Sequence, residues 1–134
     1  MKSRILVVED EDKLRRVLEL QLKSAGYDVD CAGTAEEALR AVDRVDLVLT
    51  DLRLPGMNGL ELLSSIRRQN TRTPIIVMTA FGTVETAVEA MKSGAFDFLM
   101  KPFSLDHLTT VIGKALNIRA LEDENRRLKA ELGH

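Results

Sequence analysis

Short apolar runs alternate with longer amphipathic segments along most of the chain. Residues 5–8 are all apolar, which is typical of a strand buried on both faces of a sheet. Residues 27–31 alternate between apolar and polar side chains, so we expect a more exposed strand near a sheet edge. The remaining apolar runs predict three further strands, at 45–50, 75–79 and 96–100.

The segments between these runs carry apolar residues at helical spacing. Asp12 is placed to cap a first helix and Gly26 to end it. The sequence from Thr34 to Glu37 matches a capping box, which predicts the start of a second helix. A turn cluster at 55–59 precedes a third helix from about 60 to 68.

Two more helices are predicted in the second half of the chain. One ends at Gly94 and the other begins near Ser104. Each has apolar residues along one face: Val84, Ala87, Val88 and Met91 in the first, and Leu108, Val111, Ile112 and Ala115 in the second. Five strand–helix units in succession predict an α/β fold, a doubly wound five-stranded parallel sheet with helices on both faces and right-handed crossovers.

The apolar spacing changes near the end of the chain. Five residues follow at alternating intervals of three and four, which is the a/d pattern of a coiled coil. Glu124 and Lys129 would then pair favourably across a parallel dimer. The alternative is a frayed, solvated tail, because two heptads alone are marginally stable. We call these five residues the heptad seam: Ile118, Leu121, Asn125, Leu128 and Leu132.

The length of 134 residues fits one compact domain, placed at 1–118, and a short linker at 119–134. The 19 Lys and Arg residues against 21 Asp and Glu give a net charge of −2, so we expect no nucleic-acid binding. The longest apolar runs are too short to cross a bilayer, and the start of the chain has no signal-peptide pattern. We therefore expect a cytoplasmic protein without membrane contact.

Several kinds of site are excluded by inspection. Cys31 is the single cysteine, so the chain has no internal disulfide, and with only His107 and His134 it offers no zinc cluster. The sequence also lacks the glycine-rich phosphate loop and the dinucleotide-binding turn.

Polar residues follow the predicted strands directly. Because ligands bind at the carboxyl ends of the strands in parallel α/β sheets, these side chains should converge on one edge. Each has a simpler explanation by itself, such as a surface lysine or a helix cap, and only their joint placement indicates a site. They are Glu9, Asp10, Asp51, Thr79 and Lys101.

Three carboxylates in one cleft would repel each other, so the cluster requires a cation. Oxygen ligands alone favour Mg²⁺. Asp51 stands by itself after a central-looking strand and is the best candidate nucleophile towards phosphorus, giving an aspartyl-phosphate. Mg²⁺, Lys101 and the Thr79 hydroxyl would stabilise the charge on the transferring oxygens.

Three other functions fit the sequence less well. A phosphatase or phosphotransferase enzyme with an aspartyl-phosphate intermediate needs a second acid two residues after the nucleophile, where this chain has Arg53. A flavin carrier would need hydrogen-bond donors where the first loop is acidic. A domain that only dimerises would not need the complete acid, threonine and lysine set.

The same residues resemble the receiver domain of two-component response regulators, over about residues 3–118. The resemblance implies a flavodoxin-like, CheY-like fold. The stretch 81–98 and the Glu-Asn-Arg-Arg-Leu sequence of the linker are similar to NtrC-type sigma-54-dependent activators. The motifs are Val7-Val8-Glu9-Asp10, Leu49-Thr50-Asp51, Leu54-Pro55-Gly56-Met57-Asn58-Gly59, Met78-Thr79-Ala80 and Lys101-Pro102-Phe103.

The resemblance implies that Asp51 accepts a phosphoryl group from a sensor histidine kinase. Thr79 and Lys101 would contact the phosphoryl oxygens, the Lys101-Pro102 bond would be cis, and Phe98 would be the switch aromatic. Mg²⁺ would be held by four groups, although Glu9 stands where many receivers have Asp and reaches the metal either directly or through water. These are Glu9, Asp10, Asp51 and the backbone carbonyl of Arg53.

The resemblance also implies an output. Phosphorylation would re-pack the surface of residues 82–116 and change dimerisation through the linker. In NtrC-type proteins this regulates an ATPase domain and a DNA-binding domain that would follow in the full-length chain. Self-phosphorylation and slow autodephosphorylation would be the only chemistry, so the chain is not expected to be an enzyme.

Overall fold

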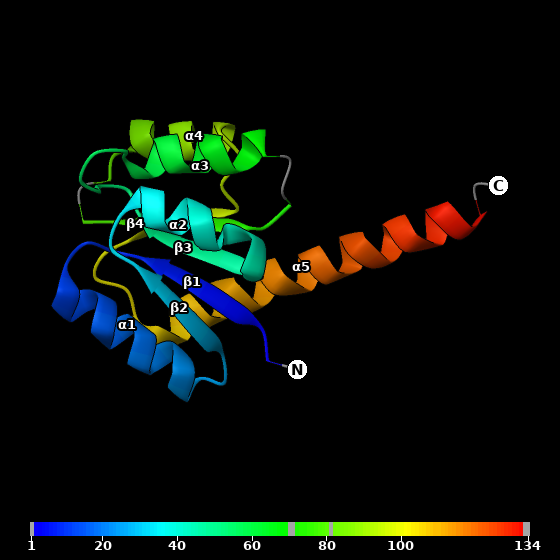
Figure 1. Ribbon diagram of the computed structural model, residues 1–134, viewed down its shortest axis with the longest axis horizontal. Coiled ribbons are helices and arrows are strands. Elements are labelled where there is room, and N and C mark those ends of the chain that lie inside the picture. Colours follow the sequence, from blue (N-terminus) through cyan, green and yellow to red (C-terminus); the bar gives the residue numbers. More distant parts are fainter. Residues whose placement is uncertain (1, 70–71, 81, 133–134) are drawn as a thin grey trace.

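The computed structural model describes residues 2–69, 72–80 and 82–132 of the chain. Its strands form one parallel sheet in the order β2-β1-β3-β4-β5 (Figure 1). The alternating strand β2 lies at an edge and β3 lies at the centre, so the predicted α/β sheet is confirmed. The strands are β1 (Arg4–Val8), β2 (Asp28–Ala32), β3 (Leu47–Asp51), β4 (Ile75–Thr79) and β5 (Asp97–Met100).

Helices cover both faces of this sheet (Figure 1). Side chains of β1 divide between the two cores, with Leu6 and Val8 on one side and Ile5 and Val7 on the other. Both faces are therefore buried, which is why residues 5–8 do not alternate. One face holds α1 (Asp12–Ser24) and α5 (Leu105–Leu132), and the other holds α2 (Ala35–Ala41), the 3₁₀ helix η1 (Val42–Arg44), α3 (Gly59–Arg68) and α4 (Val84–Lys92).

The start of α1 differs from the prediction. Glu11 is the N-cap residue and its side chain makes no capping hydrogen bond, while Asp12 is already the first helical residue. Asp12 Oδ1 instead accepts a hydrogen bond of 2.6 Å from Arg15 Nη2. The prediction that Asp12 caps the helix is wrong, because the carboxylate turns along the helix towards the arginine.

The predicted capping box at the start of α2 forms by half. Thr34 Oγ1 accepts a hydrogen bond from the Glu37 N–H at 3.2 Å, as expected. Glu37 Oε2, however, accepts from the Gly33 N–H rather than from Thr34. Thr34 therefore caps the helix, whereas the side chain of Glu37 hydrogen-bonds to Gly33, the residue before Thr34.

Helix α4 buries little of its apolar stripe. Val84 is 81% exposed, and Val88 and Met91 are also exposed. Ala90 is the buried residue of this helix and packs into the core beside α2 and α3. The predicted stripe is therefore mostly an outward-facing surface, because the side chain that fits against the sheet is the small Ala90.

Helix α5 continues without interruption from the domain into the linker, through residue 118. Its first turns bury Leu108, Val111, Ile112 and Ala115 against the sheet, as predicted. Beyond them the helix projects away from the sheet (Figure 1). The residues of the heptad seam are exposed, with Leu121 61% accessible. No helix within the described residues has both the length and the apolar character needed to cross a membrane.

Candidate functional site

The strand registers place the predicted site residues along one edge of the sheet. Val8 pairs with Thr50, and Asp51 pairs with Met78, so β1, β3 and β4 end at the same level. Glu9 follows β1, and its N–H donates to the carbonyl of Ala32 in β2 at 3.0 Å. The backbone of the parallel sheet therefore places these polar residues at one edge.

Lys101 joins two of the acids directly. Its Nζ lies 2.9 Å from Glu9 Oε1 and 2.6 Å from Asp51 Oδ2. The other carboxylate oxygens accept backbone hydrogen bonds, Asp51 Oδ1 from the Arg53 N–H at 2.9 Å and Glu9 Oε2 from the Glu11 N–H at 3.2 Å. Lys101, which follows β5, thus connects Glu9, which follows β1, with Asp51, which ends β3.

Burial and hydrogen bonding shift the pKa values of Glu9 and Lys101. Glu9 is only 2% exposed, and the pKa of its carboxyl is raised to about 7. Burial is the largest cause and the adjacent Asp51 adds to it, while hydrogen bonds from Lys101 and the Glu11 N–H oppose the rise. Burial alone would lower the pKa of Lys101, but its hydrogen bonds to Asp51 and Glu9 outweigh this and raise it. Lys101 therefore favours its charged form, whereas burial disfavours the ionised form of Glu9.

A cavity of about 340 Å³ opens onto these groups. Asp10 is exposed at its rim, whereas Asp51 lies buried within it. Thr79 is fully buried at the end of β4. The lining residues are Glu9, Asp10, Glu11, Leu14, Asp51, Arg53, Ala80 and Lys101.

The donors around this cavity fit a hard divalent cation. Within residues 2–69, 72–80 and 82–132, no three carboxylate, imidazole or thiol groups are already grouped for coordination. Glu9, Asp10 and Asp51 nevertheless supply only oxygen ligands. A cation among them would also favour the ionised form of the buried Glu9, which has a raised pKa.

The structure adds two residues that the sequence analysis did not identify. Arg15 Nη1 donates a hydrogen bond of 2.8 Å to the carbonyl of Glu9, which fixes the turn after β1. A Cβ at Gly82 would lie 2.8 Å from the ring of Phe98, so this partly buried ring rests against the glycine backbone. The only sequence signal for Arg15 is its position one turn after Asp12.

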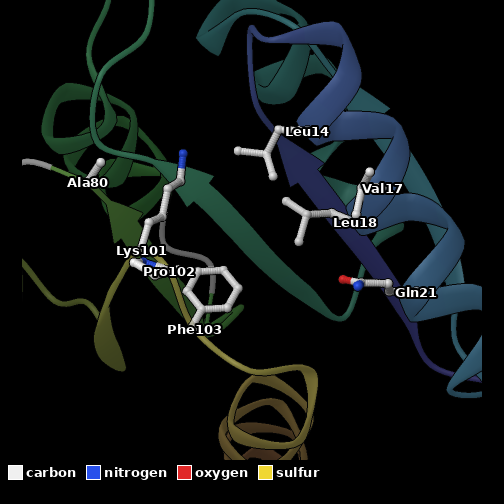
Figure 2. Close-up of a pocket in the computed structure, with 8 residues that line it drawn as sticks. All are labelled: Leu14, Val17, Leu18, Gln21, Ala80, Lys101, Pro102 and Phe103. Atoms are coloured by element: carbon white, nitrogen blue, oxygen red, sulfur yellow. The ribbon is translucent and has the colours of Figure 1, made fainter.

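A larger apolar pocket of about 440 Å³ adjoins the acidic cavity and shares Leu14, Ala80 and Lys101 with it. Figure 2 shows Leu14 and Leu18 of α1 facing Phe103 across this pocket. The loop that carries Phe103 includes the cis Lys101-Pro102 bond, as expected. Lys101 thus belongs to both a charged and an apolar recess.

A lysine-bridged pair of buried acids at the carboxyl edge of such a sheet defines a class of α/β domains in which a carboxylate at the ligand-binding edge can act as a nucleophile. Comparison with known proteins identifies the member of that class. Residues 5–113 match the response regulator receiver domain, and the chain belongs to this family. The predicted family is therefore confirmed.

Individual relatives agree with this assignment. The chain is 42% identical over 132 residues to the regulatory protein AtoC of Escherichia coli, covering 97% of this chain and 29% of AtoC. It is 40% identical over 125 residues to the response regulator PilR of Pseudomonas aeruginosa, covering 92% of this chain and 28% of PilR. The chain therefore spans less than a third of these relatives.

Solved structures give the same result. NtrX from Brucella abortus superposes with a TM-score of 0.88 at 36% identity, over 96% of this chain and 30% of NtrX. A CheY-like receiver domain protein from Methanospirillum hungatei gives 0.86 at 30% identity, over 91% of this chain and 99% of the other. The CheY-like fold and the resemblance to NtrC-type proteins are thus confirmed.

Receiver domains are the phosphoacceptors of two-component response regulators, bind Mg²⁺ at an acidic phosphorylation site and interact with histidine kinases. This membership favours a regulator over the phosphatase or phosphotransferase enzyme.

Proposed function

We propose that Asp51 accepts a phosphoryl group from the phosphohistidine of a sensor histidine kinase. A carboxylate oxygen of Asp51 forms the new P–O bond while the P–N bond to the donor breaks, and the imidazole leaves with the bonding electron pair. The observation that carries this proposal is the buried Asp51 carboxylate, held by Lys101 Nζ at 2.6 Å and by the Arg53 N–H at the floor of an open cavity.

The other site residues have distinct roles in this transfer. Lys101 turns from Asp51 towards a phosphoryl oxygen, and the Thr79 hydroxyl contacts another. Glu9, Asp10, Asp51 and the backbone carbonyl of Arg53 hold Mg²⁺, which when bound offsets the charge of the acids and of the transferring oxygens. Self-phosphorylation by small donors and slow autodephosphorylation are then the only chemistry.

Phosphorylation switches the surface of residues 82–116 by a population shift. The aspartyl-phosphate favours one arrangement through contacts that Thr79 and Lys101 make better there, and Phe98 moves with Thr79. Support comes from the exposed apolar side chains of this surface, which include Val84 and Met100. Such side chains suit a surface that exchanges partners.

The receiver of residues 1–118 and the linker of residues 119–134 act together as a dimerising unit. The exposed heptad seam supports a parallel pair of chains, and Glu124 and Lys129 can pair between them. In the full-length protein, ATPase and DNA-binding domains receive this signal in sigma-54-dependent transcription. The fragment itself binds no nucleic acid and works in the cytoplasm.

The test is the intact mass of the protein after incubation with acetyl phosphate, with and without Mg²⁺. Wild type should gain one phosphoryl group only with Mg²⁺, and Asp51→Asn should gain none. Asp43→Asn is the matched control, because Asp43 is an exposed acid in η1, outside the acidic cavity. An unmodified wild type, or a modified Asp51→Asn variant, would overturn the assignment.

A further inference from the structure

One side of α5 is attached to the base of the receiver just beyond the predicted domain boundary. Arg119 Nη1 donates a hydrogen bond of 2.8 Å to the backbone carbonyl of Asp46. Asp123 Oδ1 lies 2.8 Å from Arg72 Nη1, and Asp123 Oδ2 lies 3.9 Å from Arg119 Nε. We name these four residues, Asp46, Arg72, Arg119 and Asp123, the linker latch.

The receiver side of the linker latch is itself fixed to the sheet. The carboxylate of Asp46 accepts a hydrogen bond of 2.7 Å from the Arg4 N–H, and the Asp46 N–H donates to the Arg4 carbonyl at 2.8 Å. Arg4 begins β1, and Asp46 directly precedes β3. Arg119 is therefore held by the amino ends of two central strands rather than by a loose loop.

The latch and the heptad seam lie on opposite sides of the helix. With about 3.6 residues per turn, Arg119 and Asp123 face away from the side that carries Leu121, Asn125 and Leu128. The seam residues are exposed, whereas Arg119 is only partly exposed against the receiver. A second copy of the chain can thus bind the seam without displacing the latch.

We propose that the linker latch couples the receiver to the dimer by fixing the direction in which α5 leaves the domain. This rests on the proposed function, because a second copy of the chain is the occupant of the seam. When the contacts of the latch are formed, α5 behaves as one rigid helix, so a shift of the part packed on the receiver also moves the heptad seam. When these contacts are broken, the linker changes its direction freely, and dimerisation through the seam no longer depends on the state of the receiver.

The contacts of the latch suit such coupling. Ion pairs between exposed side chains contribute little to stability, and Arg72 and Asp123 are both exposed. Loss of the latch therefore leaves the fold intact, since the buried residues of α5 lie before it. The latch changes the freedom of the linker rather than the folding of the receiver.

The direction of the linker can be measured by itself. Spin labels on the native Cys31 in β2 and on Glu131→Cys near the end of α5 report their separation, with excess unlabelled chain to suppress distances between copies. The double variant Arg72→Met/Arg119→Met should broaden the distance distribution. Arg126→Met/Arg127→Met is the matched control, because it also removes two positive charges and neither arginine belongs to the seam or makes a contact of the latch.

The coupling is measured by the dimer dissociation constant with and without Mg²⁺ and beryllofluoride, a phosphoryl mimic. In wild type and in the control we expect a change of about tenfold, within the usual range of coupling between sites. In the latch variant it should fall below about twofold while beryllofluoride affinity is unchanged. Equal distance distributions in the latch and control variants, or full coupling without the latch, would overturn the proposal. If beryllofluoride leaves the dimer dissociation constant of wild type unchanged, the proposed function is refuted instead. The distance measurement then still decides whether the latch fixes the direction of the linker.

Discussion

Two glycines allow the same substitution to be compared in opposite surroundings. Gly59 is the first residue of α3, and its N–H donates to the carbonyl of Leu52 at 2.8 Å. A Cβ at this position would overlap the carbonyl oxygen of Asp51 and lie 2.8 Å from Leu52 Cα. Both are backbone atoms of the segment that carries the phosphoacceptor, so neither can rotate away.

Two contributions determine how much Gly59→Ala lowers the free energy of unfolding. Overpacking a tight site costs about 1–3 kcal/mol. If the start of α3 withdraws to make room, the hydrogen bond to Leu52 is lost at about 1 kcal/mol. We therefore expect the free energy of unfolding to fall by about 2–4 kcal/mol, which a domain of ordinary stability survives.

Gly113→Ala adds the same carbon atom in open space. Gly113 lies inside α5, and a Cβ there would meet nothing within 4 Å. Alanine loses less backbone entropy than glycine in a helix, so we expect a gain of about 0.5–1 kcal/mol. The two variants should therefore change stability in opposite directions.

Urea unfolding followed by far-ultraviolet circular dichroism measures both variants against wild type. The close approach of α3 to β3 would be refuted if Gly59→Ala lost less than about 0.5 kcal/mol, well below the overpacking range. A Gly113→Ala variant less stable than wild type would refute the account of α5 as an unstrained helix. Phosphorylation by acetyl phosphate should slow in Gly59→Ala alone, because only that substitution shifts the backbone of Asp51.

Three substitutions and one chemical reaction test contacts outside these glycines. Lys101→Met leaves Glu9 and Asp51 without their cation and should lower the free energy of unfolding by about 2–4 kcal/mol, part of which Mg²⁺ restores; a loss unaffected by Mg²⁺ would contradict the shared site. Arg67 donates to two backbone carbonyls, so Arg67→Met should cost about 1–2 kcal/mol in urea unfolding. Arg68→Met, which loses one exposed bond, should cost less than about 0.5 kcal/mol, and equal losses would refute this account. Burial raises the pKa of the Cys31 thiol, so iodoacetamide at pH about 8 should react more slowly with the folded chain than with the unfolded chain; equal rates would show that the fold leaves the thiol unperturbed.

The sheet and the convergence of polar residues were predictable because both depend on local pattern. A strand buried on both faces reads as an unbroken apolar run, as in residues 5–8, and a parallel sheet places all strand ends on one edge. Asp51 and Lys101 could therefore be placed near each other without knowing any distance.

The contacts between side chains were not predictable in the same way. Periodicity gives the face of a helix but not the neighbour that covers it, so Val84 and Met91 looked equivalent to core residues. The structure instead buries Ala90, in the core that α2 and α3 also line. The roles of Arg15 and Arg119 likewise depend on long side chains reaching backbone carbonyls, for which spacing carries no signal.

Strand β3 links the two ends of the proposed mechanism and also limits where motion can occur. Asp51 ends this strand, and Asp46, which anchors the linker latch, directly precedes it. All five residues of β3 are buried, and α3 buries four residues against the same core. Helix α4 buries only Ala90. Because local opening is easiest where few apolar contacts are buried, phosphorylation should move α4 and β5 and leave β3 in place. The latch attaches α5 to this fixed strand through Asp46, so a shift of the receiver part of α5 reaches the seam through one continuous helix.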